Sequence, residues 1–152
     1  MRRPLVAGNW KMNKTVEQAA VLVEELLPGL NAVPEVEKVL CPPFTALMFL
    51  SAQLEDSDIG LGAQDLHWEA SGAFTGEVAP SMIREFCKYV IIGHSERRAY
   101  FGETDETVNK KLKAALANGL IPIVCIGETL AEYESGKTGE VVKRQVLNGF
   151  KD

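Results

Sequence analysis

The chain repeats one pattern five times, a short apolar run followed by a longer helical or polar stretch, and this repetition restricts the possible folds more than any other feature. The apolar runs are centred near residues 7, 39, 61, 91 and 123, about 29 residues apart. Short apolar runs that end at glycine or proline are typical of strands buried on both faces. Strands joined by crossovers of this length are parallel, with helices covering the sheet. The pattern predicts an α/β protein built from five consecutive βα units.

Two folds are built from repeated βα units, the doubly wound sheet and the closed eight-stranded barrel. Doubly wound nucleotide-binding proteins commonly carry a G-x-G-x-x-G turn after the first strand, and no such motif follows residues 5–9. The barrel is therefore favoured. Eight units of this size need roughly 250 residues, whereas the chain has 152. We expect residues 1–152 to form a single domain, the N-terminal portion of a (β/α)8 barrel truncated before its sixth strand.

The apolar periodicity also predicts where the individual elements lie. A helix is expected from a cap at Asn13 or Thr15 to the breaker pair Pro28 and Gly29, and another begins at Thr104, which is followed by acidic residues. Shorter helices are expected over 44–54, 81–86 and 140–147. The expected strands are 5–9, 36–41, 59–63, 89–92 and 121–126.

Composition narrows the class of partner. The net charge is -5, and the 16 lysines and arginines form no basic stripe, which argues against a nucleic-acid surface. No stretch is apolar enough to suggest a signal peptide or a membrane span. The cysteines (Cys41, Cys87 and Cys125) are odd in number, far apart and set among apolar residues, as expected for reduced thiols of a cytoplasmic protein. His67 and His94 are too far apart in sequence to suggest a metal site.

Two segments around the third strand are unusual. Gly60 and Gly62 interrupt that strand, which indicates that another group packs closely against its backbone. Residues 64–79 then form a long polar loop that contains Trp68 and Phe74, which we expect to be exposed. A loop of that length in a compact domain is usually functional, and the apolar area of its aromatic residues favours contact with a partner. His67 is expected to be an ordinary loop residue.

Polar side chains follow the first and fourth strands directly. Asn9 ends the first strand and Lys11 closely follows it, and residues 93–98 (GHSERR) come after the fourth. Because the carboxyl ends of all strands in a barrel face one mouth, Lys11 and His94 can converge on one small ligand. An ammonium and an amide suit a phosphorylated, carbonyl-bearing substrate. The alternatives are a solvated lysine and a surface loop of paired charges.

Arg97 and Arg98 fit the role of structural ion-pair formers better than that of substrate ligands. Glu103 and Asp105 follow them closely in the sequence and are the candidate partners.

Residues 8–13 (GNWKMN) and 93–98 (GHSERR), together with 41–44 (CPPF), 60–65 and 125–128 (CIGE), resemble the triosephosphate isomerase family. The resemblance extends from about residue 4 to 150. It implies a (β/α)8 TIM barrel, here an incomplete array of five units, that interconverts dihydroxyacetone phosphate and glyceraldehyde 3-phosphate through an enediolate. It also implies that the family works without a cofactor or metal and as a homodimer or tetramer.

The resemblance assigns roles to residues of this chain. Lys11, His94 and Glu96 would be catalytic, and Asn9 and Lys11 would bind substrate. Lys11 would neutralise phosphate and enediolate charge, while Asn9 and His94 would donate hydrogen bonds to the developing oxyanion. His94 would act as a neutral imidazole, a role for which this family is the standard example. Supporting positions are Ser95, as a partner of the catalytic base, and Cys125, beneath the site.

The same resemblance places the dimer contact in the 64–79 loop, with Thr75 reaching the Asn9 and Lys11 region of a second subunit. The family's general base is a glutamate on the sixth strand, which these residues do not include. Glu96 and Glu128 do not occupy that position, so we expect the 152-residue chain to be inactive alone and to need a complementing C-terminal segment. The alternative is a non-catalytic folding or assembly fragment of that enzyme.

Overall fold

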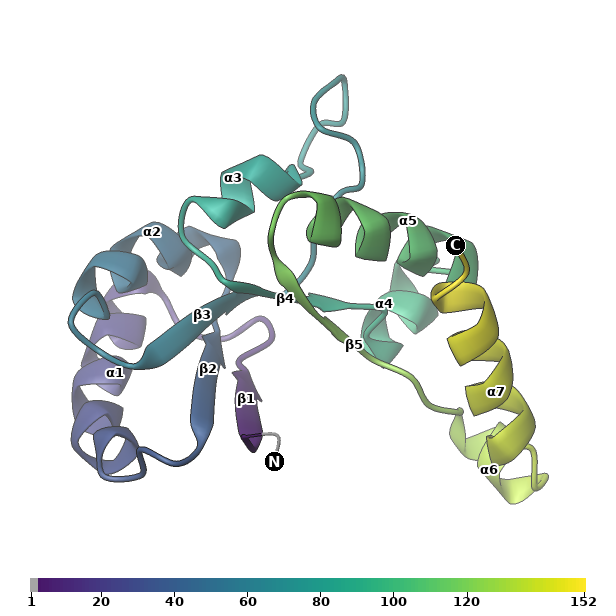
Figure 1. Ribbon diagram of the computed structural model, residues 1–152, viewed down its shortest axis with the longest axis horizontal. Coiled ribbons are helices and arrows are strands. Elements are labelled where there is room, and N and C mark those ends of the chain that lie inside the picture. Colours follow the sequence, from purple (N-terminus) through teal and green to yellow (C-terminus); the bar gives the residue numbers. More distant parts are fainter. Residues whose placement is uncertain (1–2) are drawn as a thin grey trace.

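A curved parallel sheet forms the centre of the computed structural model, which describes residues 3–152 (Figure 1). Its strands are β1 (Leu5–Asn9), β2 (Glu37–Cys41), β3 (Ile59–Ala63), β4 (Tyr89–Ile92) and β5 (Ile121–Val124). Each strand pairs in parallel with the next one along the chain. Within residues 3–152, β1 and β5 are therefore the two edges of the sheet. The predicted array of five parallel βα units is confirmed.

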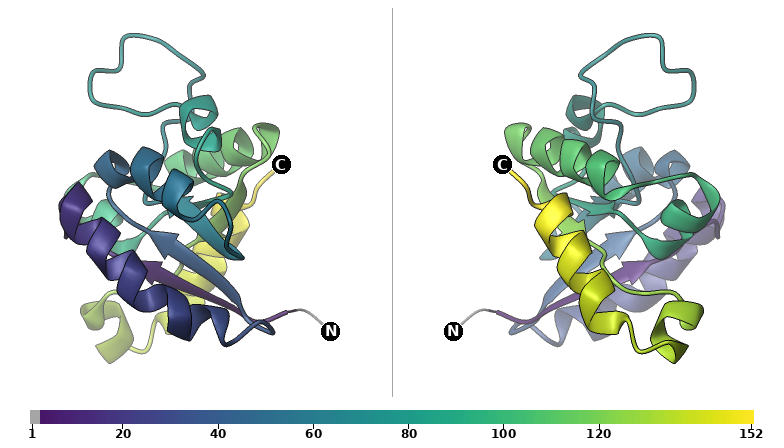
Figure 2. Two further views of the ribbon diagram at one scale, coloured as in Figure 1. Left: turned by 90° about the vertical axis from the view of Figure 1, so that its left-hand side faces the viewer. Right: turned by 90° about the vertical axis from the view of Figure 1, so that its right-hand side faces the viewer.

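Helices cover the convex side of this sheet (Figures 1 and 2). The four longer ones are α1 (Val16–Asn31), α2 (Phe44–Gln53), α5 (Asp105–Ala117) and α7 (Thr138–Gly149). The three short ones are α3 (Pro80–Arg84), α4 (Ser95–Tyr100) and α6 (Leu130–Glu134). No helix within residues 3–152 is long and apolar enough to cross a membrane.

Strands β2, β3 and β4 bury apolar side chains on both faces, as their unbroken apolar runs predict. The edge strands β1 and β5 do not, because their residues are exposed or half-buried. On β2, Leu40 belongs to the large outer cluster that includes Val23 of α1 and Leu50 of α2. Its neighbours Val39 and Cys41 point the opposite way, into a smaller inner cluster. The other buried members of that inner cluster are Tyr89 and Ile91 of β4. The alternation follows from the two-residue period of a strand.

The two glycines of β3 make room for this inner cluster. A Cβ atom on Gly60 would lie 2.8 Å from the ring of Tyr89, and one on Gly62 would lie 2.8 Å from Sγ of Cys41. Neither distance is compatible with ordinary van der Waals contact. The predicted close approach of another group to β3 is confirmed, and that group is the side-chain layer of β2 and β4.

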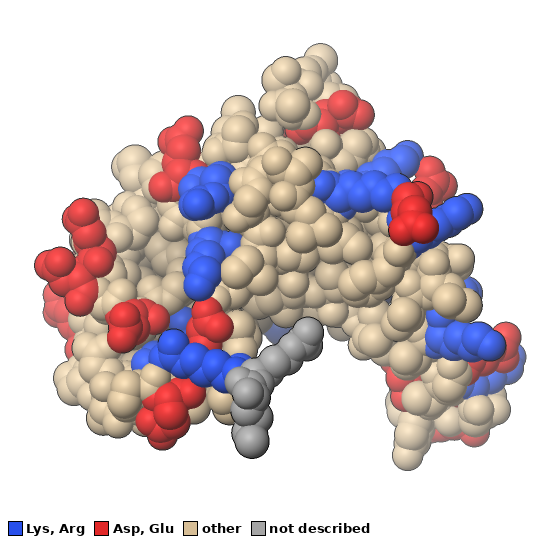
Figure 3. All heavy atoms as spheres, in the orientation of Figure 1, with Lys and Arg blue, Asp and Glu red and all other residues tan. Residues whose placement is uncertain are grey.

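The sheet curls without closing on itself. Figure 3 shows a hollow between the β1 side of the molecule and the α6–α7 side, and its roof is largely uncharged. The edge strands contribute to the apolar surface: Val6 of β1 is 64% exposed and Ile121 of β5 is 44% exposed. The chain thus has the architecture of part of a barrel wall.

Some element boundaries differ from the sequence prediction. Helix α1 does not end at Pro28 but continues to Asn31. Leu27 and Leu30, on either side of the proline, pack against the core, and this burial outweighs the backbone hydrogen bond that proline cannot donate. Of the two candidate caps, Thr15 is the one used, because its side chain accepts from the backbone of Gln18.

The apolar periodicity did not predict two short helices. Helix α4 begins directly after His94 and is almost wholly polar, so it shows no apolar period. Helix α6 is only five residues long, although the capping box between Thr129 and Glu132 is a sequence signal for its start. The predicted cap of Thr104 on α5 is confirmed.

Candidate active site

The loop after β1 holds Lys11 in an unusual backbone conformation. Lys11 has φ of 53°, a left-handed conformation that costs a residue with a side chain about 1 to 3 kcal/mol. Side-chain amides tie both ends of this residue. Its N–H donates to Oδ1 of Asn9 at 3.0 Å, and its carbonyl accepts from Nε2 of Gln64 at 2.9 Å. The surrounding structure therefore specifies where the Lys11 side chain points.

The fourth strand ends in Gly93 and His94, and His94 caps helix α4. Its Nδ1 accepts a hydrogen bond from the backbone N–H of Glu96 at 3.2 Å. A ring nitrogen that accepts a hydrogen bond carries no proton, so the imidazole in this arrangement is neutral and Nε2 is its N–H donor. The carboxylate of Glu96 lies 3.6 Å from the same Nδ1, too far for a hydrogen bond, so the backbone contact decides the tautomer.

The two loops meet through an ion pair. Nζ of Lys11 lies 2.6 Å from Oε1 of Glu96. This hydrogen bond from Lys11 holds the pKa of the Glu96 carboxyl below its ordinary value. Both side chains remain partly open to solvent, with 51% of the Lys11 side chain and 42% of the Glu96 side chain exposed. The pair could therefore reorganise around an anionic ligand.

Helix α4 is fixed in place by its two arginines. Arg97 contacts Asp65 at 2.9 Å and Glu103 at 2.8 Å. Arg98 contacts Asp105 at 2.7 Å and also donates to the carbonyl of Gly93 at 2.8 Å. The predicted structural ion pairs of Arg97 and Arg98 with Glu103 and Asp105 are confirmed.

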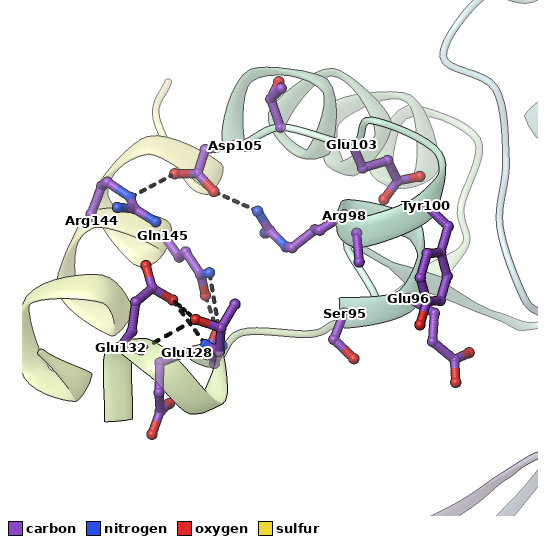
Figure 4. Close-up of a pocket in the computed structure, with 14 residues that line it drawn as sticks. Ser95, Glu96, Arg98, Tyr100, Glu103, Asp105, Glu128, Glu132, Arg144 and Gln145 are labelled. Atoms are coloured by element: carbon purple, nitrogen blue, oxygen red, sulfur yellow. Dashed lines mark hydrogen bonds and ion pairs between the residues drawn. The ribbon is translucent and has the colours of Figure 1, made fainter. Parts of the chain in front are cut away.

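A hollow of about 560 Å³ lies behind Ser95 and Glu96, between α4, α5 and the α6–α7 region (Figure 4). At one end, Asp105 bridges Arg98 and Arg144. Lys11 and His94 do not line this hollow. The hollow therefore lies beside the cluster of Lys11, Glu96 and His94, and these three side chains do not converge in it.

The two residues predicted to support the site, Ser95 and Cys125, directly follow or lie close to the ends of β4 and β5. Ser95 is the first residue of α4 and lines the hollow of Figure 4. Cys125 directly follows β5 and packs against the inner cluster. Burial raises the pKa of its thiol, which fits a packing residue better than a nucleophile.

The loop of residues 64–79 projects away from the rest of the molecule and carries the exposed Thr75 (Figures 1 and 2). His67 is more than an ordinary loop residue, because it is 8% exposed and stacks on Trp68 and Phe74 with ring centroids 4.3 Å away in each case. Trp68 is only partly exposed, contrary to the prediction, because Lys110 lies over its ring. This stack organises the base of the projecting loop.

Sequence reasoning missed three residues that support the site. Gln64 ties the carbonyls of Lys11 and Cys41, and its only signal is its place at the end of β3. Asp65 and Lys111 form a buried ion pair at 2.6 Å. Burial is the main cause that raises the pKa of Asp65, to about 6. Lys111 lies in the middle of an amphipathic helix and gives no sign that its side chain is buried.

Together these features define a class of protein. Parallel βα units in sequence order, with an ammonium, an imidazole and an amide at the carboxyl ends of β1 and β4, are the features of a (β/α)-barrel protein, a fold whose members carry their ligand sites at that mouth. A family model described as triosephosphate isomerase matches residues 4–152. The chain belongs to the triosephosphate isomerase family.

Relatives agree along nearly the whole chain. It is 60% identical over 152 residues to the triosephosphate isomerase of Moorella thermoacetica, and that match covers 99% of this chain and 61% of the relative. It is 56% identical over 153 residues to that of Endomicrobium trichonymphae, covering 100% of this chain and 61% of the relative.

A solved structure of the same family has the same fold over nearly the whole chain. The crystal structure of triosephosphate isomerase from Bartonella henselae superposes with a TM-score of 0.94 at 38% identity, covering 99% of this chain and 63% of that one. The chain thus spans about three fifths of the length of the relatives that it matches.

Proposed function

We propose that this chain provides the electrophilic and charge-neutralising part of a triose-phosphate isomerase site, for the interconversion of dihydroxyacetone phosphate and glyceraldehyde 3-phosphate. The observation that carries the proposal is the meeting of Lys11, Glu96 and His94 at one mouth. In the reaction, a base removes a proton from the carbon next to the carbonyl, and the carbonyl oxygen becomes an enediolate oxygen. Transfer of the hydroxyl proton on the neighbouring carbon to that oxygen, together with protonation of the former carbonyl carbon, completes the isomerisation.

Each group has a place in that step. The Nε2–H of His94 and the amide nitrogen of Asn9 donate to the developing oxyanion. The oxygen of Asn9 is already held by the N–H of Lys11, so its nitrogen is the group that it presents to a substrate. The ammonium of Lys11 balances the negative charge of the phosphate and of the enediolate. The site in this part of the chain thus stabilises the intermediate.

The proton-abstracting base is, in this proposal, a group that these 152 residues do not provide. Glu96 is engaged by Lys11 at 2.6 Å, and Glu128 accepts a hydrogen bond from the hydroxyl of Thr138 at 2.9 Å. We therefore expect the purified chain to show no isomerase turnover above that of a mock preparation. Turnover that survives purification would show that it has a base of its own.

Ligand binding tests the site without requiring turnover. Dihydroxyacetone phosphate, added to the isotopically labelled chain, should shift the NMR signals of Lys11 and His94. Lys11→Met should weaken this binding about tenfold to a hundredfold, because it removes a charge-assisted hydrogen bond. Lys14→Met is the matched control, since Lys14 lies in the same loop and also has a positive φ, of 77°. Equal binding by the two variants would contradict the proposal.

A homodimer formed through the 64–79 loop belongs to the same proposal. The exposed Thr75 and the aromatic stack beneath it support a protein partner for this loop. Thr75→Arg should remove the dimer from the sedimentation-velocity distribution, whereas Asn148→Arg, on the exposed side of α7, should leave the distribution unchanged. An unchanged profile for Thr75→Arg would count against the assignment.

Two further observations support other parts of the proposal. The free edges of β1 and β5 favour docking of a complementing C-terminal segment, and they equally favour the second candidate function, a folding or assembly fragment. The free state of Cys41, Cys87 and Cys125 supports a cytoplasmic location. Mixing the chain with a synthetic or expressed C-terminal segment of a relative separates the two functions. Isomerase turnover should appear in the mixture if the chain is part of an isomerase site, and it should not appear if the chain is only a folding or assembly fragment.

A further inference from the structure

Two consecutive residues at the end of β3, Gln64 and Asp65, touch both loops that form the Lys11–Glu96 pair. Neither residue contacts the ammonium of Lys11 or the carboxylate of Glu96. Gln64 reaches the loop after β1, and Asp65 reaches helix α4 after β4. Strand β3 itself lies between β2 and β4 in the sheet, so its carboxyl end stands between the two loops.

Gln64 holds the first member of the pair through the backbone. Its Nε2 donates to the carbonyl of Lys11 at 2.9 Å and to the carbonyl of Cys41 at 2.8 Å. Both protons of the amide are thereby used. The contact fastens the left-handed Lys11 residue to the end of β2, and a left-handed conformation at a residue other than glycine persists only where the surroundings impose it.

Asp65 holds the second member through the neighbour of Glu96. Its Oδ2 lies 2.9 Å from Nη2 of Arg97, and its Oδ1 lies 2.6 Å from Nζ of Lys111. Asp65 is 6% exposed and Lys111 is 3% exposed. A buried carboxylate needs such partners, so the contact with Arg97 is an obligatory part of the core.

Helix α4 depends on contacts of this kind. It has six residues, too few to be stable without tertiary contacts. Arg98 supplies one anchor at Asp105, and Arg97 supplies the other at Asp65 and Glu103. The orientation of Glu96, between His94 and Arg97 on the first turn, follows from these anchors.

We infer that Gln64 and Asp65 are positioning residues that together hold the Lys11–Glu96 pair in place, Gln64 by fixing the backbone of Lys11 and Asp65 by fixing α4 through Arg97. As a statement about ligand binding, this inference rests on the proposed function. As a statement about the pair, it stands on the contacts alone. On this inference, the residues that follow β3 set the distance between the loop after β1 and helix α4, although β3 itself carries none of the proposed catalytic residues.

The experiment compares Gln64→Met and Asp65→Asn with the unaltered chain, because these changes keep side-chain size while removing the donor or the charge. The readout is the pH titration of the Glu96 side-chain carboxyl carbon by NMR. In both variants its midpoint should rise toward the ordinary glutamate value, because Lys11 no longer meets Glu96. Binding of dihydroxyacetone phosphate should also weaken by about tenfold.

Each variant has a matched control elsewhere in the fold. Gln53 also donates its amide to a backbone carbonyl, that of Ala20, at 3.1 Å. Glu37 pairs with Lys88 at 3.1 Å near the amino ends of the strands. Gln53→Met and Glu37→Gln should leave the titration of Glu96 and the binding unchanged. A purely structural role of Gln64 and Asp65 would alter stability without moving the Glu96 midpoint.

The outcomes separate this inference from the proposed function. An unchanged Glu96 titration in both variants overturns the inference, whatever the ligand does. A raised midpoint together with no binding by the unaltered chain supports the inference and counts against the proposed function. If a variant fails to fold, a hydrogen-bond scalar coupling between Nε2 of Gln64 and the carbonyl carbon of Lys11 in the unaltered chain tests the first link directly, and its absence overturns that link.

Discussion

Lys11 and Glu96 are 85 residues apart in the chain, yet Nζ of one lies 2.6 Å from Oε1 of the other. Their strands, β1 and β4, are not neighbours, because β2 and β3 lie between them. In a flat sheet, three strand spacings would separate these ends by roughly 14 Å. The contact therefore depends on the curl of the sheet.

Removing the ammonium should be visible at the carboxyl group. Because the hydrogen bond from Lys11 lowers the pKa of Glu96, Lys11→Met should raise that pKa toward its ordinary value, measured by NMR titration. The ion pair favours the charged form of Glu96. Its small contribution to the stability of the folded chain is therefore fully present above the ordinary glutamate pKa, and it is lost as the pH falls through the lowered pKa of Glu96. Lys14→Met should leave the midpoint where it is, and a rise in that control would indicate a general field effect.

The inner layer of side chains should not tolerate a methyl group on β3. Gly62→Ala should destabilise the chain by about 1 to 3 kcal/mol, because the new Cβ would lie 2.8 Å from Sγ of Cys41. Gly29→Ala is the opposite case, since nothing lies within 4 Å of its Cβ position in α1, and alanine should stabilise the helix by up to about 1 kcal/mol. Urea unfolding monitored by circular dichroism measures the free energy of unfolding of both variants. A loss of stability for Gly29→Ala with none for Gly62→Ala would contradict the close packing against β3.

The three thiols should react at different rates. Burial raises the pKa of Cys41 and of Cys87 to about 12, so at pH 8 only about one in ten thousand of these groups is a thiolate. Cys125 is less buried and should be alkylated first by iodoacetamide, as followed by mass spectrometry of the native chain. In denaturant all three should react alike. Fast labelling of Cys41 in the native chain would argue against the closed inner layer.

The exposed edge of β1 should promote self-association. An edge strand presents unpaired backbone groups, and a charged side chain on it discourages pairing with another molecule. Val6→Lys should therefore lower the fraction of large, concentration-dependent species in sedimentation velocity. Val21→Lys places the same charge on a residue of α1 that is 50% exposed and should have little effect. A clean monomer for the unaltered chain would refute the role of the edge.

The sequence was sufficient for the strands, because a strand buried on both faces appears as an unbroken apolar run, as at residues 89–92. It also predicted that Lys11 and His94 lie just past the carboxyl ends of two strands, since each comes soon after such a run. It could not show that Pro28 lies inside α1, because the burial of Leu27 and Leu30 that outweighs the proline is a tertiary effect. Nor could it show that Gln64 and Asp65 reach two separate loops, since a glutamine and an aspartate at the start of a loop are ordinary surface residues by composition.

The order of the strands has a consequence for how the chain is made. Each strand pairs with the one synthesised just before it, so every addition to the sheet uses a template that has already left the ribosome. Contacts between neighbouring units are short in sequence, which favours rapid formation, and folding from the N-terminus during synthesis suits such an array. The Lys11–Glu96 contact joins the first unit to the fourth, so it can form only when the fourth unit arrives. Its appearance during translation would therefore mark the moment at which the growing sheet becomes curved.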